Sequence, residues 1–384
     1  MEDFTFQNLI NLFLVLISWL LVIFLLTAKT KNKTSNILLA SFLLVNAQDS
    51  SGILASYFVY PTHPGLGMLI NNTVFFKLPL LYLYLLSVIY SNFKLKAKHL
   101  FHILGFVINF IILWPDFFAV DFESKWTFLE ANAAGHELLA IKLSYITLHI
   151  QLFIYLVICF IEIKKYKQLL LENYADTKLL HHQWLFQLVT LLTISILLAT
   201  IKNALRFMHL DVIFFYINWL VQLLALGIIC WMVLKALHSP ELFRGINSKL
   251  QLVKHMIKSE QHVTKSNNED SEEIRSLKTY MEMEEPYLNP NLTIYKLSDQ
   301  LQVPIKQLSL LINHDMNQHF FDFVNSYRIK KAMTLLQDPD KKDITVLEIL
   351  YDVGFNSKSS FNTAFRKYTN LTPTQFRKRA LNDL

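Results

Sequence analysis

Long hydrophobic runs fill the first part of the chain and stop well before its end. Residues 1–237 are apolar with thin polar breaks, whereas residues 238–384 carry frequent charges. The hydrocarbon core of a bilayer is about 30 Å thick, so a spanning helix needs about 20 mostly apolar residues. The pattern predicts seven such helices, over residues 6–26, 36–59, 66–90, 99–118, 138–162, 184–207 and 212–234.

The lysines of the connecting loops predict how these helices are oriented. Loops 27–35, 91–98 and 163–183 each contain three or more lysines, whereas loop 60–65 contains no Lys or Arg and loop 119–137 is acidic. Lys and Arg concentrate in cytoplasmic loops, so the N-terminus is predicted outside and everything after the last span in the cytoplasm. The first apolar run is too long for a cleaved signal peptide and lacks a basic segment before it, so we expect it to be retained.

Ionisable side chains interrupt the predicted spans, and five of them are the candidate ligand contacts of this half: Asp49, Lys77, His149, Lys202 and Arg206. Such a group at the bilayer centre costs at least about 2.5–3.5 kcal/mol unless it is paired or hydrated. From the helical rise, Asp49, Lys77 and His149 lie at similar depths, each roughly 15 Å from the outer end of its span. We expect Asp49 to pair with Lys77, with His149 beside them.

Two interpretations of these groups stay open. They can line a polar cavity open to the outside, where a small molecule or an ion binds. Alternatively, they form a structural ion pair that fixes the helices, while Lys202 and Arg206 extend to the outer surface. The chain contains neither H-E-x-x-H nor G-x-S-x-G, and Cys159 and Cys230 lie within apolar runs. We therefore expect no enzyme activity, no cofactor and no metal.

The segment after the last span, residues 238–270, is predicted to be a cytoplasmic connector between domains 1–237 and 271–384. Its apolar residues repeat at intervals of three and four, as in a short coiled coil: Phe243, Ile246, Leu250, Val253 and Ile257. The same spacing suits an amphipathic helix whose Lys and Arg face anionic lipid. A dimerisation helix and a membrane-surface helix therefore both stay open.

Helix start and stop signals in the last third of the chain predict two helix-turn-helix units joined by a long helix. In the first unit, Thr293 can cap one helix, and a break at 302–304 precedes the next. The long helix follows over 320–337. In the second unit, Thr345 begins a capping box, and Gly354 suits the left-handed turn before another capped helix.

These segments resemble the DNA-binding domain of the AraC/XylS family of bacterial transcription regulators. The resemblance extends from near Lys278 to near Arg379 and is carried by three stretches: PYLNPNLTIYKLSDQLQVPIKQLSLLIN, FVNSYRIKKAMTLL and ILYDVGFNSKSSFNTAFRKYTNLTPTQFR. It implies that the second helix of each unit enters a major groove, so that one chain reads two adjacent grooves. A connecting helix about 25 Å long, together with the two units, is able to bridge grooves about 34 Å apart.

The resemblance and the helical spacing assign the candidate DNA contacts. In the first unit, the resemblance places base-reading positions at Lys306, Ser309 and Leu310, and the leucine suits a thymine methyl group. Gln307 faces the same groove. The remaining candidates are Lys358, Ser359, Asn362 and Thr363 for bases, and Asn313, Arg366, Lys367, Arg377 and Lys378 for phosphates. For residues 377–379 alone, a solvated charged surface is the alternative.

Together these expectations describe an all-α, one-component transcription regulator with a seven-helix membrane bundle and a cytoplasmic DNA-binding domain. The bundle is expected to respond to a signal at its outer or intramembrane face. In bacteria, the DNA lies in the cytoplasm, which the inner membrane bounds directly. We therefore expect a multi-pass protein of the bacterial inner membrane. Expected partners are double-stranded DNA, the lipid bilayer, a small-molecule or ion signal, a second copy of the chain and RNA polymerase. The alternatives are a transporter or membrane enzyme with a fused regulatory domain, and an anchored regulator that senses nothing.

Overall fold

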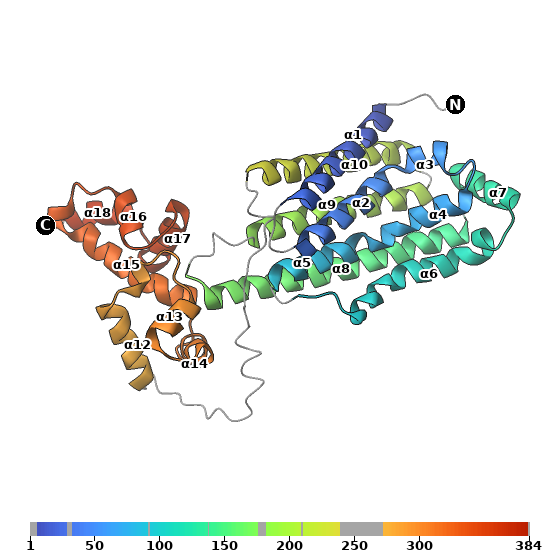
Figure 1. Ribbon diagram of the computed structural model, residues 1–384. Coiled ribbons are helices and arrows are strands. Elements are labelled where there is room, and N and C mark those ends of the chain that lie inside the picture. The colour runs from blue at the N-terminus through green and yellow to red at the C-terminus, as the bar shows by residue number, and fades with distance from the viewer. Residues whose placement is uncertain are drawn as a thin grey trace. The chain divides into compact units, whose positions relative to one another are not determined.

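The computed structural model describes two compact helical units (Figure 1). The described residues are 6–28, 33–90, 93–136, 138–175, 182–208, 210–238 and 272–382. The first unit comprises Met1–Lys164 with His182–Lys249, and the second comprises Lys165–His181 with Leu250–Leu384. Helices make up nearly all of the described ranges, and no strand occurs in them, so the all-α prediction is confirmed. The predicted connector lies outside the described residues except for His238.

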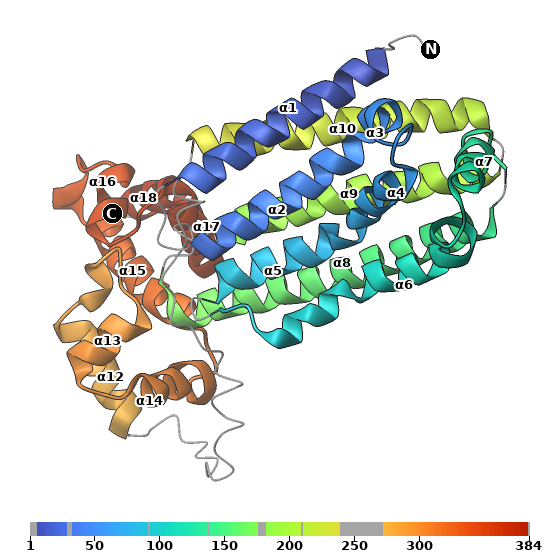
Figure 2. The ribbon, with the colours of Figure 1, turned by 45° about the vertical axis from the view of Figure 1, so that its right-hand side comes forward.

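The first unit is a bundle of roughly parallel and antiparallel helices (Figures 1 and 2). Helix α1 packs against α2 and α10, α2 packs against α5, and α9 packs against α10. The helices are α1 (Phe6–Thr27), α2 (Lys33–Ser50), α3 (Gly52–Phe58), α4 (Pro64–Asn72), α5 (Lys77–Ile89), α6 (Leu104–Leu113), α7 (Phe122–Ala133), α8 (Leu139–Asn173), α9 (His182–Phe207) and α10 (Asp211–His238). Short helical turns η1 (Thr73–Phe76), η2 (Ala97–Ile103) and η3 (Trp114–Phe118) extend α5 and α6.

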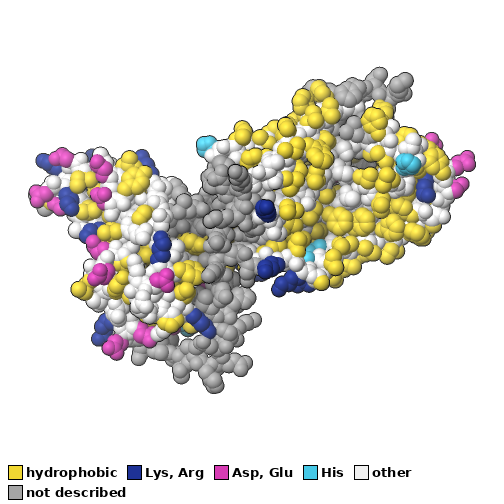
Figure 3. All heavy atoms as spheres, in the orientation of Figure 1, with side chains coloured by type: hydrophobic (Ala, Val, Ile, Leu, Met, Phe, Trp, Pro, Cys, Tyr) yellow, Lys and Arg dark blue, Asp and Glu magenta, His cyan; other side chains and the backbone are white. Residues whose placement is uncertain are grey.

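Six helical segments of the described chain are long and apolar enough to cross a bilayer. They are Gln7–Thr27, Pro64–Ile89, Ala97–Phe118, Leu139–Asn173, Gln183–Leu205 and Val212–His238. Hydrophobic side chains cover much of the visible face of this bundle (Figure 3). The predicted span over 36–59 is not among the six, because that stretch divides at Ser51 into α2 and α3. The count of seven therefore stays a prediction.

Helix α8 is longer than the apolar pattern predicted. The predicted span ended at residue 162 and a loop followed, yet the helix continues to Asn173. In this extension Tyr166, Leu169 and Leu170 recur at intervals of three and one, on one side of the helix, and all three are buried. Such a one-sided apolar stripe stabilises a helix only when another element covers it. The extension belongs to the second compact unit from Lys165 onward.

The second unit contains two hydrophobic cores that share helix α15 (Phe320–Gln337). The first core joins the N-terminal half of α15, including Phe320 and Phe323, to α12–α14. The second joins its C-terminal half, including Ile329 and Leu336, to α16–α18. The other helices are α12 (Glu272–Met283), α13 (Ile294–Leu301), α14 (Ile305–Leu310), α16 (Val346–Asp352), α17 (Lys358–Thr369) and α18 (Pro373–Asn382).

The predicted helix caps are confirmed in the second unit. Thr293 accepts a hydrogen bond from the Lys296 amide at the start of α13. Thr345 and Glu348 form the reciprocal capping box of α16. Accepting the Thr345 hydrogen bonds lowers the pKa of Glu348, because these bonds stabilise its ionised form. Local side-chain chemistry therefore sets where these helices begin.

The turn that connects α12 to α13 holds the two helix-turn-helix units together. Gly354 has a φ of +88° and is buried where a Cβ would lie 2.6 Å from the carbonyl oxygen of Tyr287. Arg328, 0% exposed, donates from Nε to that same carbonyl at 2.7 Å and from Nη2 to the carbonyl of Asn289 at 2.9 Å. Its guanidinium also lies 5.4 Å from the centre of the Phe355 ring. One buried cation thus connects both units.

Replacing Gly354 with alanine tests this joint. We expect Gly354→Ala to lose at least about 1–3 kcal/mol of stability in the second unit, since a non-glycine residue is strained at this φ and its Cβ meets main-chain oxygens that cannot move aside. Pulse proteolysis of the intact protein, with detection of cleavage within residues 272–382, measures this loss of stability. Gly227→Ala is the control, because nothing lies within 4 Å of its added Cβ. Equal protease resistance of the two variants would contradict the assigned close packing.

Candidate nucleic-acid interface and candidate ligand cavity

Helix α17 presents the predicted DNA-reading residues of the second unit to solvent. Ser357 caps it by accepting from the Ser360 amide, and Phe361 and Phe365 lie in the core. On the other side, the side chains of Lys358, Ser359, Thr363 and Arg366 are exposed, and Asn362 is half-buried. This division follows the helical period, so the exposed side is available to a groove. The individual base and phosphate contacts stay predictions.

Two contacts anchor α17 to the connecting helix α15. Lys367 Nζ lies 2.6 Å from Asp322 Oδ1, and the Tyr368 hydroxyl donates to the Asp322 carbonyl at 2.8 Å. Burial and then the neighbouring Asp322 carboxylate raise the pKa of Tyr368 to about 12, so it stays a neutral donor at physiological pH. Lys367, which we predicted to contact phosphate, is thus paired with a carboxylate while its side chain remains 60% exposed.

The groove beside α17 combines amide, hydroxyl and basic side chains. Its lining is formed by Asn362, Thr363, Arg366, Lys367 and Thr372. From α18, Lys378 is exposed and Arg377 is half-buried. Both were predicted to contact phosphate. Amide, hydroxyl and basic side chains are the residue types with which proteins contact DNA bases and phosphates.

The first unit presents its predicted DNA residues differently. Gln307 is exposed and donates to Glu273 Oε1 at 3.1 Å, whereas Lys306 and Leu310 are half-buried. Ser309 is only 1% exposed. Asn313 donates its side-chain amide to the Ser309 carbonyl at 3.0 Å and to the Glu172 carbonyl at 3.3 Å. Three of the five candidate positions of the first unit, Gln307, Ser309 and Asn313, are therefore engaged or covered.

The carbonyl that accepts from Asn313 belongs to the end of α8. Two residues follow this helix end, Tyr174 and Ala175. Tyr174 forms an isolated antiparallel bridge with Thr293, and Ala175, 1% exposed, is part of the first hydrophobic core. Sequence reasoning placed this segment in a loop and missed the contact. The one-sided apolar stripe of Tyr166, Leu169 and Leu170 could have predicted a packed helix here, because such a stripe is not expected in a solvated loop.

A cavity of about 750 Å³ lies inside the first unit. Four of the five residues predicted to contact a ligand line it: Asp49, Lys77, His149 and Lys202. The side chain of Arg206 lies outside the described part of the structure. Residues of α7, including Trp126 and Glu130, also contribute to the lining. The cavity therefore extends to the helix that we predicted in an outer loop.

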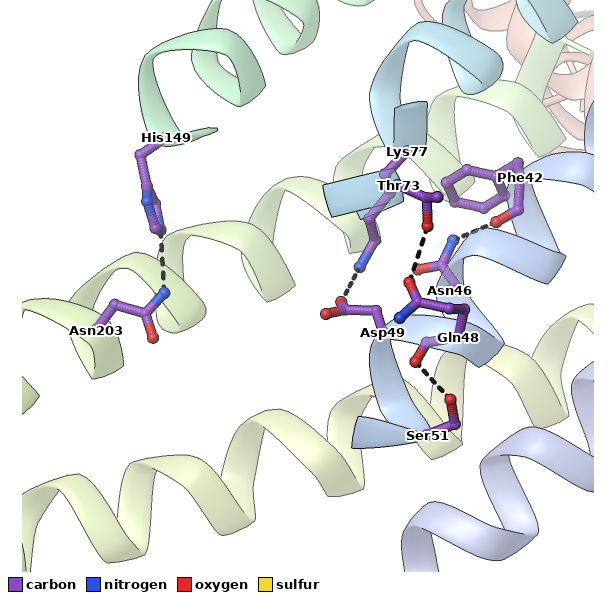
Figure 4. Close-up of polar contacts among 9 residues, drawn as sticks. All are labelled: Phe42, Asn46, Gln48, Asp49, Ser51, Thr73, Lys77, His149 and Asn203. Atoms are coloured by element: carbon purple, nitrogen blue, oxygen red, sulfur yellow. Dashed lines mark hydrogen bonds and ion pairs between the residues drawn. The ribbon is translucent and has the colours of Figure 1, made fainter. Parts of the chain in front are cut away.

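The predicted pairing of Asp49 with Lys77 is confirmed. Lys77 Nζ, at the start of α5, lies 3.1 Å from Asp49 Oδ2 near the end of α2 (Figure 4). His149 accompanies a different partner: its Nε2 lies 3.4 Å from Asn203 Nδ2, and its Nδ1 lies 2.7 Å from the Tyr145 carbonyl. The His149–Asn203 contact lies apart from the ion pair in Figure 4. Both pairs line the same cavity.

Amide and hydroxyl side chains supply most of the remaining polar lining. Among them are Asn46, Asn71 and Asn203. Thirteen more were not singled out from the sequence: Asn11, Ser18, Ser50, Ser56, Tyr60, Asn72, Asn109, Asn132, Ser144, Tyr145, Ser195, Asn218 and Gln222. Asn109 Oδ1 and Gln222 Oε1 are buried and accept no hydrogen bond from the described residues. Buried acceptors are normally satisfied, so each of these two oxygens can accept a hydrogen bond from a further donor.

The described residues contain no group of three His, Cys, Asp or Glu side chains able to hold a metal ion. The ionisable lining of the cavity balances in charge, with Asp49 and Glu130 against Lys77 and Lys202.

Comparison with known proteins agrees with the geometry of the second unit. Residues 297–379 match the family model described as a helix-turn-helix domain. The chain is 31% identical over 93 residues to the uncharacterized transcriptional regulatory protein YesN of Bacillus subtilis, covering 24% of this chain and 25% of that protein. It is 29% identical over 87 residues to the melibiose operon regulatory protein of Escherichia coli K12, covering 23% and 28%.

Among solved structures, the C-terminal domain of AraT, a response regulator from Geobacillus stearothermophilus, is 25% identical, with a TM-score of 0.26, over 29% of this chain and 88% of that chain. The chain spans roughly a quarter of the length of the two curated relatives named above. The family match, over residues 297–379, lies in the second unit. The C-terminal domain of this chain is an AraC-type helix-turn-helix domain.

Proposed function

We propose that the protein is a membrane-embedded, one-component transcription regulator of the bacterial inner membrane. The observation that carries the proposal is the presence of an AraC-type domain, with its second candidate recognition helix exposed, in the same chain as six helices suited to a bilayer. A regulator of this arrangement needs no separate kinase or messenger, because one polypeptide joins the membrane to DNA.

Two observations support the orientation with the DNA-binding domain in the cytoplasm. In Figure 3, Asp and Glu side chains gather at the end of the bundle where α7 lies, and Lys and Arg side chains lie toward its opposite end. This is the distribution that the positive-inside rule describes. In addition, Lys165–Ala175, from the loop predicted to be cytoplasmic, packs within the DNA-binding unit. The two segments must share a compartment for that contact to form.

The cavity of the bundle is the proposed signal site. Its carboxylates and ammonium groups balance, and its amides and hydroxyls offer many directional hydrogen bonds. An ion of one charge would find no excess of the opposite charge there. The lining therefore favours an uncharged, hydroxyl-rich molecule or a zwitterion, whose donors would satisfy Asn109 and Gln222. Buried polar groups paired in this way give specificity as well as affinity.

The exposed face of α17 predicts two different kinds of defect. Thr363→Ala should relax sequence preference at one base pair, by about 1–3 kcal/mol, because Thr363 faces outward near the start of the helix. Arg366→Ala should weaken binding to all sequences and reduce the slope of log affinity against log salt by about one. Both are measured by salt-controlled selection from genomic fragments with the intact protein in nanodiscs.

Lys342→Ala is the control for this comparison. It removes one exposed positive charge from a residue outside α17 and α18, so its binding should match that of the unaltered chain. If all three variants lost affinity equally and none changed site preference, the domain would bind DNA as a general polycation, and specific recognition by α17 would be wrong.

Substitutions of Asp49 and Lys77 test whether this ion pair contacts a ligand or only stabilises the bundle. Neutral sugars, polyols and zwitterionic amino acids, tested as a panel, should include molecules that raise the Tm of the purified protein, since a ligand that binds only the folded state stabilises it. Asp49→Asn should abolish that shift. The double exchange Asp49→Lys with Lys77→Asp retains an ion pair in reverse, so it should restore basal Tm without restoring the ligand shift.

Recovery of the ligand shift by the double exchange would contradict a direct ligand role for this pair. Stabilisation of the unaltered protein by charged molecules alone would contradict the proposed ligand class. Operator binding that does not depend on any cavity variant or ligand would indicate that the bundle serves only as an anchor.

A further inference from the structure

The end of α8 occupies a position inside the DNA-binding unit that connects it to three other elements. The Ala175 amide donates to the Leu292 carbonyl at 3.4 Å, beside the Tyr174–Thr293 bridge. Asn325 of α15 donates to the Ala175 carbonyl at 3.4 Å. Asn313, which follows α14, donates to the Glu172 carbonyl at 3.3 Å. This segment, Lys165–Ala175, is called the α8 tail below.

The α8 tail contacts Asn313, a predicted phosphate-contacting residue that follows the first recognition helix. Asn313 bonds the tail and Ser309 at once, and Ser309 is 1% exposed. A base contact requires the reading side chain to reach an edge of the base pair in the major groove, which a covered serine does not do. Because Asn313 is a predicted phosphate contact, the tail and a DNA duplex compete for its side-chain amide. The corresponding residues of the second unit, such as Lys358 and Thr363, are exposed.

The hydrogen bonds that join the tail to the rest of the second unit are long. They measure 3.3–3.5 Å, including one from Arg328 Nη1 to the Ala175 carbonyl at 3.5 Å. Within the DNA-binding domain itself, Arg328 donates to Tyr287 and Asn289 at 2.7 and 2.9 Å. Hydrogen bonds weaken as the donor–acceptor distance exceeds about 3.2 Å. Loss of the tail therefore leaves the shorter bonds of the domain in place.

The same helix reaches the cavity of the bundle. Tyr145 and His149 of α8 line that cavity, and α8 continues without interruption to Asn173. At 1.5 Å per residue, His149 and Asn173 are roughly 36 Å apart along one helix. A molecule that binds preferentially when α8 is shifted or rotated would bias the tail, because ligand and tail act on one rigid element.

We propose that the α8 tail is an autoinhibitory element that docks beside the first recognition helix and holds Asn313, so that binding of a full two-groove operator requires its release. This inference rests on the proposed DNA-binding function and adds the regulation of the first unit. With the tail in place, the chain contacts DNA through the second unit. With the tail released, Asn313 becomes available and the affinity for a full operator rises.

A disulfide that holds the tail in place tests the proposal in the intact protein. Residues directly opposite in an antiparallel bridge have Cα atoms about 4.5–5.5 Å apart, within the range of about 4.4–6.8 Å that a disulfide requires. The variant Tyr174→Cys with Thr293→Cys, made with Cys159→Ala and Cys230→Ala, should form that bond on oxidation. In nanodiscs, we expect the oxidised form to bind the full operator at least tenfold more weakly than the reduced form.

The reduced form of the same protein is the matched control, since it carries every substitution, including the loss of the Thr293 cap. Each single-cysteine variant should show no effect of oxidation. Affinity for a half-operator that contains only the second-unit site should be equal in the oxidised and reduced forms, which distinguishes a covered first unit from general damage.

A second variant removes the tail contact instead of fixing it. Ala175 is packed in the core, so Ala175→Arg cannot dock, and its charge would face Arg328. We expect at least tenfold tighter full-operator binding, with unchanged half-operator binding. Lys167→Ala, at an exposed position of the tail, should leave both affinities unchanged.

The outcomes separate this inference from the proposed function. Equal full-operator affinity in the oxidised and reduced forms overturns the autoinhibitory role, and failure of the disulfide to form overturns the docked geometry. If the reduced form and the unaltered protein select no operator at all, the proposed function itself fails.

Discussion

The buried guanidinium of Arg328 is the interaction on which the arrangement of the DNA-binding unit depends. It joins the turn before α13, through the carbonyls of Tyr287 and Asn289, to the aromatic ring of Phe355 in the second helix-turn-helix unit. A buried charge is expensive unless its donors are satisfied, so the carbonyls must stay where they are. Gly354 allows the close approach, because a side chain there would strike the same turn.

This joint also explains how a contact can be lost without unfolding the domain. The bond from Arg328 to Ala175 is the longest of its main-chain contacts, at 3.5 Å, and the two shorter ones connect parts of the DNA-binding domain to each other. Each core is built on its own half of α15. The α8 tail contributes Ala175 to the first of these cores, whose other buried residues belong to the DNA-binding domain.

The bundle is governed by a different constraint, the cost of polar groups in an apolar environment. The Asp49–Lys77 pair and the amides around it face a cavity, where they contact one another, and hydrophobic side chains cover much of the outer face. A lipid-facing amide would have no partner. The polar residues that interrupt the apolar runs are thus gathered by packing into one lining, and that lining has the balanced charge of a site for a neutral or zwitterionic molecule.

The sequence by itself determined the features that depend on local chemistry. Caps at Thr293, Thr345 and Ser357, the left-handed turn at Gly354 and the inward side of α17 follow from side chains within a few residues of each other. The Asp49–Lys77 pair was also predictable, since the helical rise gives depth and opposite charges at one depth attract. Only the tertiary structure decided what long-range packing controls. Sequence spacing could not show that α2 and α3 divide at Ser51, that thirteen further polar residues line the same cavity, or that a predicted loop continues as helix and contacts Asn313. Each of these depends on which distant segment supplies the opposing surface, and a one-dimensional pattern does not contain that information.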